Sequence, residues 1–192
     1  MSRPQTKGTN LIDMVKFLRS QRDAARRLLP EALHRYLDSR LDVGAWYPEE
    51  DMIGLVQALA RLLPRSGEDP LVQIGRLNAR MHLQGTYAHL LKDARPTTLP
   101  VRAVALWKTM HDTGEFRLAV DEGSAHARLS GYGHPSAEMC AMLGGYLLQL
   151  FVLAGARDVK VDESTCCRRG ADACCWRIEW TPSDDDGEGS SA

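Results

Sequence analysis

The sequence predicts an α+β fold in which N-terminal helices are followed by a hairpin, a helix and a second hairpin. Apolar residues recur with the helical period as far as residue 111, and then alternate with polar residues in two pairs of segments, 116–129 and 159–180. One strongly apolar helical stretch separates the two pairs. Together the hairpins predict a four-stranded, mainly antiparallel sheet packed against helices.

Length and composition favour a single domain. A chain of 192 residues that is 44% hydrophobic buries a core without disulfides. We expect one domain over 1–182, with a helical half at 10–98 and a core at 99–182, and a disordered acidic tail at 183–192. The formal charge of −1 argues against nucleic acid as a partner. No apolar run is long enough for a membrane span, and five cysteines without a secretory leader indicate the cytoplasm.

Four helices are expected in the first half of the chain. Asn10 is placed to cap the first, the second runs from Pro30 to about Leu41, the third follows Pro48, and the fourth spans about 70–91. Arginines around the second helix indicate a solvated face, because the neutral charge balance disfavours nucleic-acid binding. These arginines are Arg22, Arg26, Arg27, Arg35 and Arg40.

The Trp46-Tyr47-Pro48 triplet interrupts the helical pattern. Proline keeps the residue before it out of the helical region, so we expect a packed corner here, with an exposed docking surface as the alternative. The triplet also has a weak resemblance to an uncharacterised bacterial family.

Two histidines, His82 and His89, share one face of the helix expected at 70–91. Such a pair is able to bind a metal or haem, but the HxxxH and HxxH spacings are absent. Core or surface positions are therefore the favoured interpretation.

Small residues mark a candidate ligand pocket. In the first hairpin Ala125 and Ala127 alternate with polar residues, and the neighbouring helices add Gly75, Ala79 and Ala103. The same residues allow helices to pack closely on the sheet. The sequence therefore leaves open both a small hydrophobic ligand and a filled core.

Four of the five cysteines lie in the second hairpin, where the alternation of strand residues separates them. Cys174 is in phase with the apolar positions of its strand and should point inward, whereas Cys175 should point outward. A turn at Gly170 is expected to bring Glu163 and Cys166 close to Cys174.

A tetrahedral metal ion needs one more ligand, and Cys140 in the preceding apolar helix is the remaining cysteine. Adjacent cysteines are poor chelators of a single ion, so Cys167 and Cys175 are expected not to bind it. The candidate metal ligands are Cys140, Glu163, Cys166 and Cys174. The alternative is a set of reduced thiols without a metal.

The order Cys140, Glu163, Cys166, Gly170 and Cys174, followed by an aromatic strand, resembles the 4-vinyl-reductase-type domain over about residues 100–182. That domain is named after 4-vinyl reductase accessory proteins and forms the sensory part of bacterial activators of phenol catabolism. The resemblance implies a structural zinc ion held by the three cysteines and the glutamate. It also implies a superfamily that is related to haem-based nitric-oxide sensors.

Two classes of function follow from these observations. One is a non-enzymatic ligand-binding or sensory domain that signals through a protein partner. The other is a dimeric interaction or scaffold module without a small-molecule ligand. A homodimer is expected through the apolar Cys140 helix and the Trp46-Tyr47 corner. Enzymatic activity is disfavoured, because the sequence has no convincing Ser-His-Asp spacing, phosphate loop or dinucleotide fingerprint.

Overall fold

The C-terminal half of the protein is built on one four-stranded antiparallel sheet. The computed structural model describes residues 3–64 and 67–182. Its sheet has the order β3-β4-β6-β5, and the strands are β3 (Glu115–Asp121), β4 (Ser124–Ser130), β5 (Arg157–Thr165) and β6 (Ala173–Thr181). The predicted α+β fold and its two hairpins are confirmed. The expected disordered tail at 183–192 lies outside the described residues.

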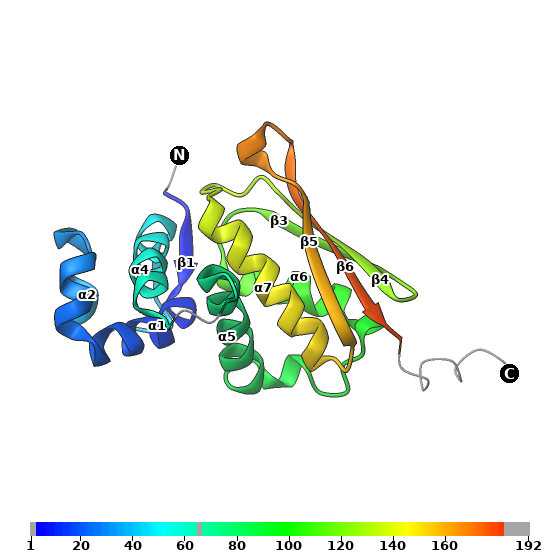
Figure 1. Cartoon of the computed structure of the whole chain (residues 1–192), viewed down its shortest axis with the longest axis horizontal. Helices are drawn as coiled ribbons and strands as arrows, with labels where there is room; N and C mark the ends of the chain where they lie inside the picture. The colour runs from blue at the N-terminus through cyan, green and yellow to red at the C-terminus, as the bar shows by residue number, and fades with distance from the viewer. Residues whose placement is uncertain (1–2, 65–66, 183–192) are drawn as a thin grey trace, which may run out of the picture.

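Helices make up the N-terminal half and cover the sheet. They are α1 (Gly8–Ser20), α2 (Arg22–Leu28), α3 (Arg35–Asp38), α4 (Glu49–Leu62), α5 (Pro70–Gln84), α6 (Leu99–Met110) and α7 (Ala137–Leu153), with short 3₁₀ turns at Glu31–Leu33, Ala88–Leu90, Pro96–Thr98 and Cys167–Arg169. Figure 1 shows α5 and α7 between the sheet on one side and α1, α2 and α4 on the other, and α6 packs against β3. Over the described ranges, none of these helices has the length and apolar character needed to cross a bilayer.

Several expected helix boundaries are corrected by the structure. The helix predicted from Pro30 to about Leu41 is a 3₁₀ turn followed by the four-residue α3, and α2 precedes it. The helix predicted over about 70–91 ends at Gln84. Asn10 does not cap α1, because the helix starts at Gly8 and the Asn10 amide instead donates to Thr6 Oγ1 at 2.8 Å.

The Trp46-Tyr47-Pro48 segment forms a strand that sequence reasoning did not identify. Strand β2 (Trp46–Pro48) pairs antiparallel with β1 (Gln5–Lys7). The Lys7 ammonium lies over the Trp46 ring, 4.2 Å from its centroid, and partly covers the indole. A two-stranded sheet therefore closes the N-terminal half at this corner.

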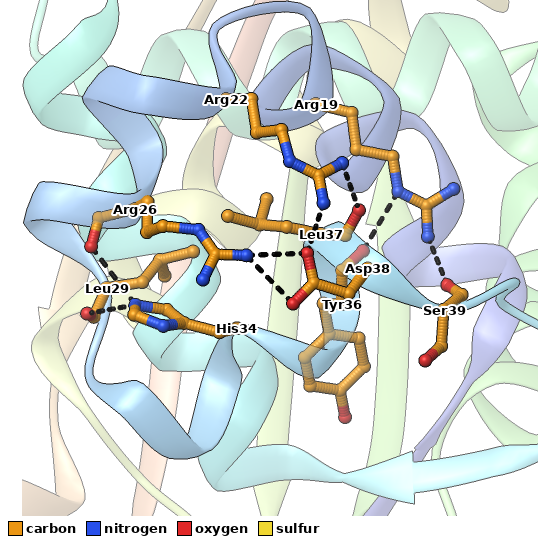
Figure 2. A network of polar contacts seen from close by, with 9 residues as sticks. All are labelled: Arg19, Arg22, Arg26, Leu29, His34, Tyr36, Leu37, Asp38 and Ser39. Carbon is orange, nitrogen blue, oxygen red and sulfur yellow. Dashed lines mark hydrogen bonds and ion pairs between the residues drawn. The ribbon is translucent and has the colours of Figure 1, made fainter.

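Arginines of α1 and α2 bind the C-terminal end of α3, as Figure 2 shows. Arg22 Nη1 donates to the Leu37 carbonyl at 3.0 Å, and Arg26 Nη2 donates to both carboxylate oxygens of Asp38 at 2.7 and 2.8 Å. Arg19 donates to two further carbonyls. These contacts satisfy carbonyls that a helix end leaves without intrahelical partners, so the arginines serve the fold of the N-terminal half.

Two glycines allow α5 and α7 to cross in direct backbone contact. A Cβ added at Gly75 would lie 1.9 Å from the Met142 carbonyl oxygen, and one added at Gly145 would lie 2.1 Å from the Val72 carbonyl oxygen. The apolar helix α7 is therefore covered within the chain, by α5 on one side and by β5 and β6 on the other. Its apolar surface no longer gives an argument for the homodimer expected from the sequence.

Candidate ligand pocket and thiol cluster

An apolar pocket lies where α5, α6 and α7 meet near β3. Its volume is about 70 Å³. Ala103 and Trp107 of α6 line it together with Phe116 of β3, and Met142 and Leu147 of α7 complete these walls. Its lining contains no Lys, Arg, Asp or Glu. Because an unpaired charge is costly to bury in such surroundings, the pocket is suited to an uncharged molecule.

The side chains of His82 and Tyr146 form a polar corner of the pocket. His82 Nε2 lies 3.2 Å from the Thr9 carbonyl oxygen, and His82 Nδ1 lies 3.4 Å from Tyr146 Oη. The carbonyl only accepts, so we assign the ring proton to Nε2 and let Nδ1 accept from the hydroxyl. Burial lowers the pKa of His82 to about 4, so this corner is uncharged at neutral pH.

The buried imidazole predicts a loss of stability in acid. An unfolded histidine titrates near 6.5, whereas the folded His82 has a pKa of about 4. Between these values the unfolded chain binds more protons, so the free energy of unfolding falls as the pH is lowered through this window. The expected loss is about 3 kcal/mol, at roughly 1.4 kcal/mol per pH unit. Urea unfolding at pH 7 and pH 4 measures it, and His82→Gln should show a smaller decrease. An equal decrease in the variant would contradict this assignment.

A second buried polar group joins the N-terminal half to the core, and two of its members, Asn10 and His111, also line the pocket. His111 Nδ1 lies 2.6 Å from Glu49 Oε1, and both residues are buried. His111 Nε2 lies 3.4 Å from Asn10 Nδ2, which also donates to Thr6 Oγ1. Because the carboxylate only accepts, the imidazole proton is assigned to Nδ1, and Nε2 accepts from the amide. Sequence reasoning missed this group, since Glu49 and His111 are 62 positions apart and no local pattern connects them.

The small residues singled out in the sequence have different surroundings in the structure. Gly75 and Ala103 line the pocket. Ala79, Ala125 and Ala127 are fully buried and are not among its lining residues. Ala125 and Ala127 sit in β4 between the neighbouring strands β3 and β6. The pocket is thus displaced from the first hairpin towards the three helices.

The four predicted metal-ligating residues come together at the neck of the second hairpin. One ligand atom from each of Cys140, Glu163, Cys166 and Cys174 lies within 4.8 Å of the others. Cys140 Sγ is 3.8 Å from Cys166 Sγ and 3.6 Å from Cys174 Sγ. A tetrahedral ion with metal–sulfur bonds of about 2.3 Å places neighbouring sulfurs about 3.8 Å apart. The thiols are therefore spaced as such an ion requires.

Glu163 presents one free carboxylate oxygen within this cluster. Its Oε2 pairs with Arg169 Nη2 at 3.0 Å, while Oε1 is buried and has no hydrogen-bond partner. A buried acceptor without a partner is costly, and a cation would satisfy it. Cys167 and Cys175 are half-buried and do not belong to the group of converging ligand atoms.

A groove gives the cluster contact with solvent. Its volume is about 320 Å³, and its lining includes Cys140, Glu163 and Cys166. Burial raises the pKa of the Cys140 thiol, and it raises that of Cys174 to about 11. The groove offers a route by which a metal ion could reach three of the four ligands.

The whole fold is similar to that of H-NOX proteins. A triple mutant of an H-NOX protein from S. oneidensis in the Fe(II) ligation state matches with a TM-score of 0.67 and 17% identity, over 93% of this chain and 98% of that one. A mutant of T. tengcongensis H-NOX matches with a TM-score of 0.65 and 14% identity, over 93% of this chain and 99% of that one. An oxygen-binding H-NOX domain related to soluble guanylate cyclases matches with a TM-score of 0.62 and 13% identity, over 92% of this chain and 95% of that one. No protein-family model and no curated protein sequence matches this chain. At such low identities the structural similarity shows the fold alone, which is that of the H-NOX proteins.

The resemblance to the 4-vinyl-reductase-type domain is wrong, because the similar solved structures are H-NOX proteins. The weak resemblance of the Trp46-Tyr47-Pro48 triplet finds no family model to support it. The structural zinc cofactor implied by the first resemblance is corrected with it, since the similar structures are H-NOX proteins in Fe(II) ligation states. The spacing of the four ligands reflects a helix followed by a hairpin. That topology also occurs in the H-NOX fold, so the spacing does not identify the family.

The pocket of this chain does not fit a haem group. Haem iron is commonly held by a proximal histidine, but both ring nitrogens of His82 and of His111 have partners. The pocket volume of about 70 Å³ is also many times too small for a porphyrin. No cationic side chain lines the pocket to pair with the two carboxylates of haem. The chain therefore has the H-NOX fold around a pocket whose lining does not fit haem.

Proposed function

We propose that this protein is a non-enzymatic sensory or regulatory domain that binds a small molecule in the apolar pocket and signals through a protein partner. The observation that carries the proposal is the pocket between α5, α6 and α7, which has apolar walls and an uncharged polar corner. Its position supports a signalling role. The Asn10–His111–Glu49 group, of which Asn10 and His111 line the pocket, connects α1 and α4 to the core, so a ligand there would act on the junction of the two halves.

A catalytic role receives no support from the polar groups near the pocket. The Glu49–His111 pair resembles part of a catalytic dyad, but His111 Nε2 faces the amide of Asn10 and has no hydroxyl or thiol as its partner. The H-NOX fold of the neighbours agrees with a sensory domain. The second class of function, an interaction module without a small-molecule ligand, is the outcome if the pocket binds nothing.

The ligand-binding role predicts thermal stabilisation by small uncharged hydrophobes. A ligand present at a hundred times its dissociation constant should stabilise the protein by about 2.7 kcal/mol. Ala103→Leu should abolish this stabilisation, because the larger side chain fills the pocket. Ala105→Leu, on the exposed side of the same helix, should retain it. If both variants respond like the wild type, the ligand binds elsewhere.

We also propose that Cys140, Glu163, Cys166 and Cys174 bind one thiol-preferring metal ion. The spacing of their ligand atoms and the unpartnered Oε1 of Glu163 support this site. Elemental analysis of the purified protein should find about one transition-metal ion per chain. Cys174→Ser should lose it, while Cys175→Ser should keep it. A folded wild-type protein without metal, which cannot be loaded, would exclude the site.

A further inference from the structure

We infer that the pocket is a haem-independent site for one uncharged molecule smaller than benzene. This inference rests on the proposed function, because it names the class of ligand that the same pocket takes. The pocket has a volume of about 70 Å³. An apolar cavity of about 150 Å³ binds benzene or xenon. A pocket of half that volume accepts a molecule of a few heavy atoms, and a porphyrin is many times too large.

The first wall of the pocket is fixed by the packing of Trp107. Its ring stacks on His111 with a centroid distance of 4.1 Å and on Phe116 with one of 5.8 Å. Its Nε1 donates to the carbonyl oxygens of Thr113 and Gly114, both at 3.1 Å. To enlarge the pocket here, the indole would have to give up both its hydrogen bonds and its stacking on two rings. The free energy lost in that change exceeds the binding free energy of a weakly bound ligand.

The opposite wall is fixed by the α5–α7 crossing. Gly75 and Gly145 hold the two helix backbones in contact, with no room for even a methyl group between them. A larger ligand would have to separate helices that are packed at interior density. Both walls therefore resist enlargement of the pocket.

The polar corner limits the ligand further, to an uncharged molecule, and the other polar side chains that line the pocket, those of Asn10, Asn78 and His111, agree with this limit. Both nitrogens of His82 have partners, so the imidazole offers a ligand neither a free donor nor a free acceptor. Tyr146 Oη can accept one additional hydrogen bond. An apolar molecule, or one that carries a single small donor, satisfies this corner without leaving a buried group unpaired.

Haem uptake tests the first part of the inference. The protein is produced in cells supplied with a haem precursor and is then titrated with haemin, with the S. oneidensis H-NOX protein as positive control. We expect no stoichiometric Soret absorption from this chain under conditions in which the control loads fully. A 1:1 haem complex with an axially ligated spectrum would overturn the inference, while leaving a sensory function with haem as its ligand.

Probes of different size test the second part. Cyclopropane should shift the Met142 and Met139 methyl resonances in NMR spectra, and naphthalene at the same free concentration should not. Ala103→Leu should abolish the cyclopropane shift, and Ala105→Leu should preserve it. Naphthalene binding within the pocket would overturn the size limit. If neither probe shifts these methyl groups in a folded protein, both this inference and the ligand-binding function fail.

Discussion

Replacement of His111 by alanine should lower the free energy of unfolding by about 3 kcal/mol, because it leaves a buried carboxyl group without its hydrogen-bond donor. The imidazole provides the hydrogen bond to Glu49 Oε1 at 2.6 Å, and Glu49 is fully buried with its other oxygen unpartnered. Alanine also removes the ring that stacks on Trp107. Equilibrium unfolding in urea measures the change.

Glu50, the neighbour of Glu49 in the sequence, provides a control for this prediction. Glu50 pairs with Arg3 at 3.5 Å on an exposed surface, so Glu50→Gln should change stability by less than about 1 kcal/mol. A double replacement, Glu49→Leu with His111→Leu, should recover part of the loss, because it removes both buried polar partners together. A loss in His111→Ala no larger than that in Glu50→Gln would show that the buried pair does not hold the two halves together.

Replacement of Gly145 by alanine should destabilise the protein by about 3 kcal/mol, at the upper end of the usual effect of overpacking. Its new methyl group would lie 2.1 Å from the Val72 carbonyl oxygen, so α5 and α7 would have to separate. This effect opposes the gain of about 1 kcal/mol that alanine brings over glycine inside a helix. Thermal or urea unfolding measures the net change.

The adjacent Gly144 provides a control that separates the steric effect of the new methyl group from its effect on helix propensity. A methyl group at Gly144 would meet Trp176 at 3.6 Å, which is an ordinary contact. Gly144→Ala should therefore be neutral or stabilising by up to about 1 kcal/mol. If Gly144→Ala and Gly145→Ala have the same stability, the close crossing of α5 and α7 is not as described.

The sheet and the thiol cluster were predictable because their signals are local. The alternation that places Cys174 inward also buries Trp176 and Ile178, and the structure has all three at 3% exposure or less. Cys140, Glu163 and Cys166 lie on consecutive elements, α7 and β5 with the turn after it. A helix that leads directly into a hairpin brings such residues together through short connections.

The N-terminal half was less predictable because distant contacts set its boundaries. Helix α1 starts at Gly8, where a methyl group would lie 2.2 Å from the Asp42 carbonyl oxygen. That contact allows only glycine and moves Asn10 from the expected cap into the helix. Similarly, α3 ends at Asp38, where arginines of α1 and α2 bind its carbonyls and carboxylate. Neither contact leaves a pattern in the neighbouring sequence.

The sequence did not determine where the pocket lies, for a related reason. A small residue either makes room for a ligand or admits a neighbouring backbone, and the sequence does not distinguish the two uses. Ala127 is covered within the sheet, Gly75 serves both the helix crossing and the pocket, and Ala103 lines the pocket alone. The family resemblance was wrong for a similar reason. The order and spacing of the four candidate metal ligands reflect a helix followed by a hairpin, and different families share that topology.

A crystal structure of the protein under xenon pressure tests the central claim most directly, because xenon binds to apolar cavities that are large enough for it. We expect one xenon atom between Ala103 and Met142, within the pocket formed by α5, α6 and α7, and no xenon in the same crystal form of Ala103→Leu. A wild-type crystal without xenon at this position, in which side chains of the three helices fill the space, would contradict the account.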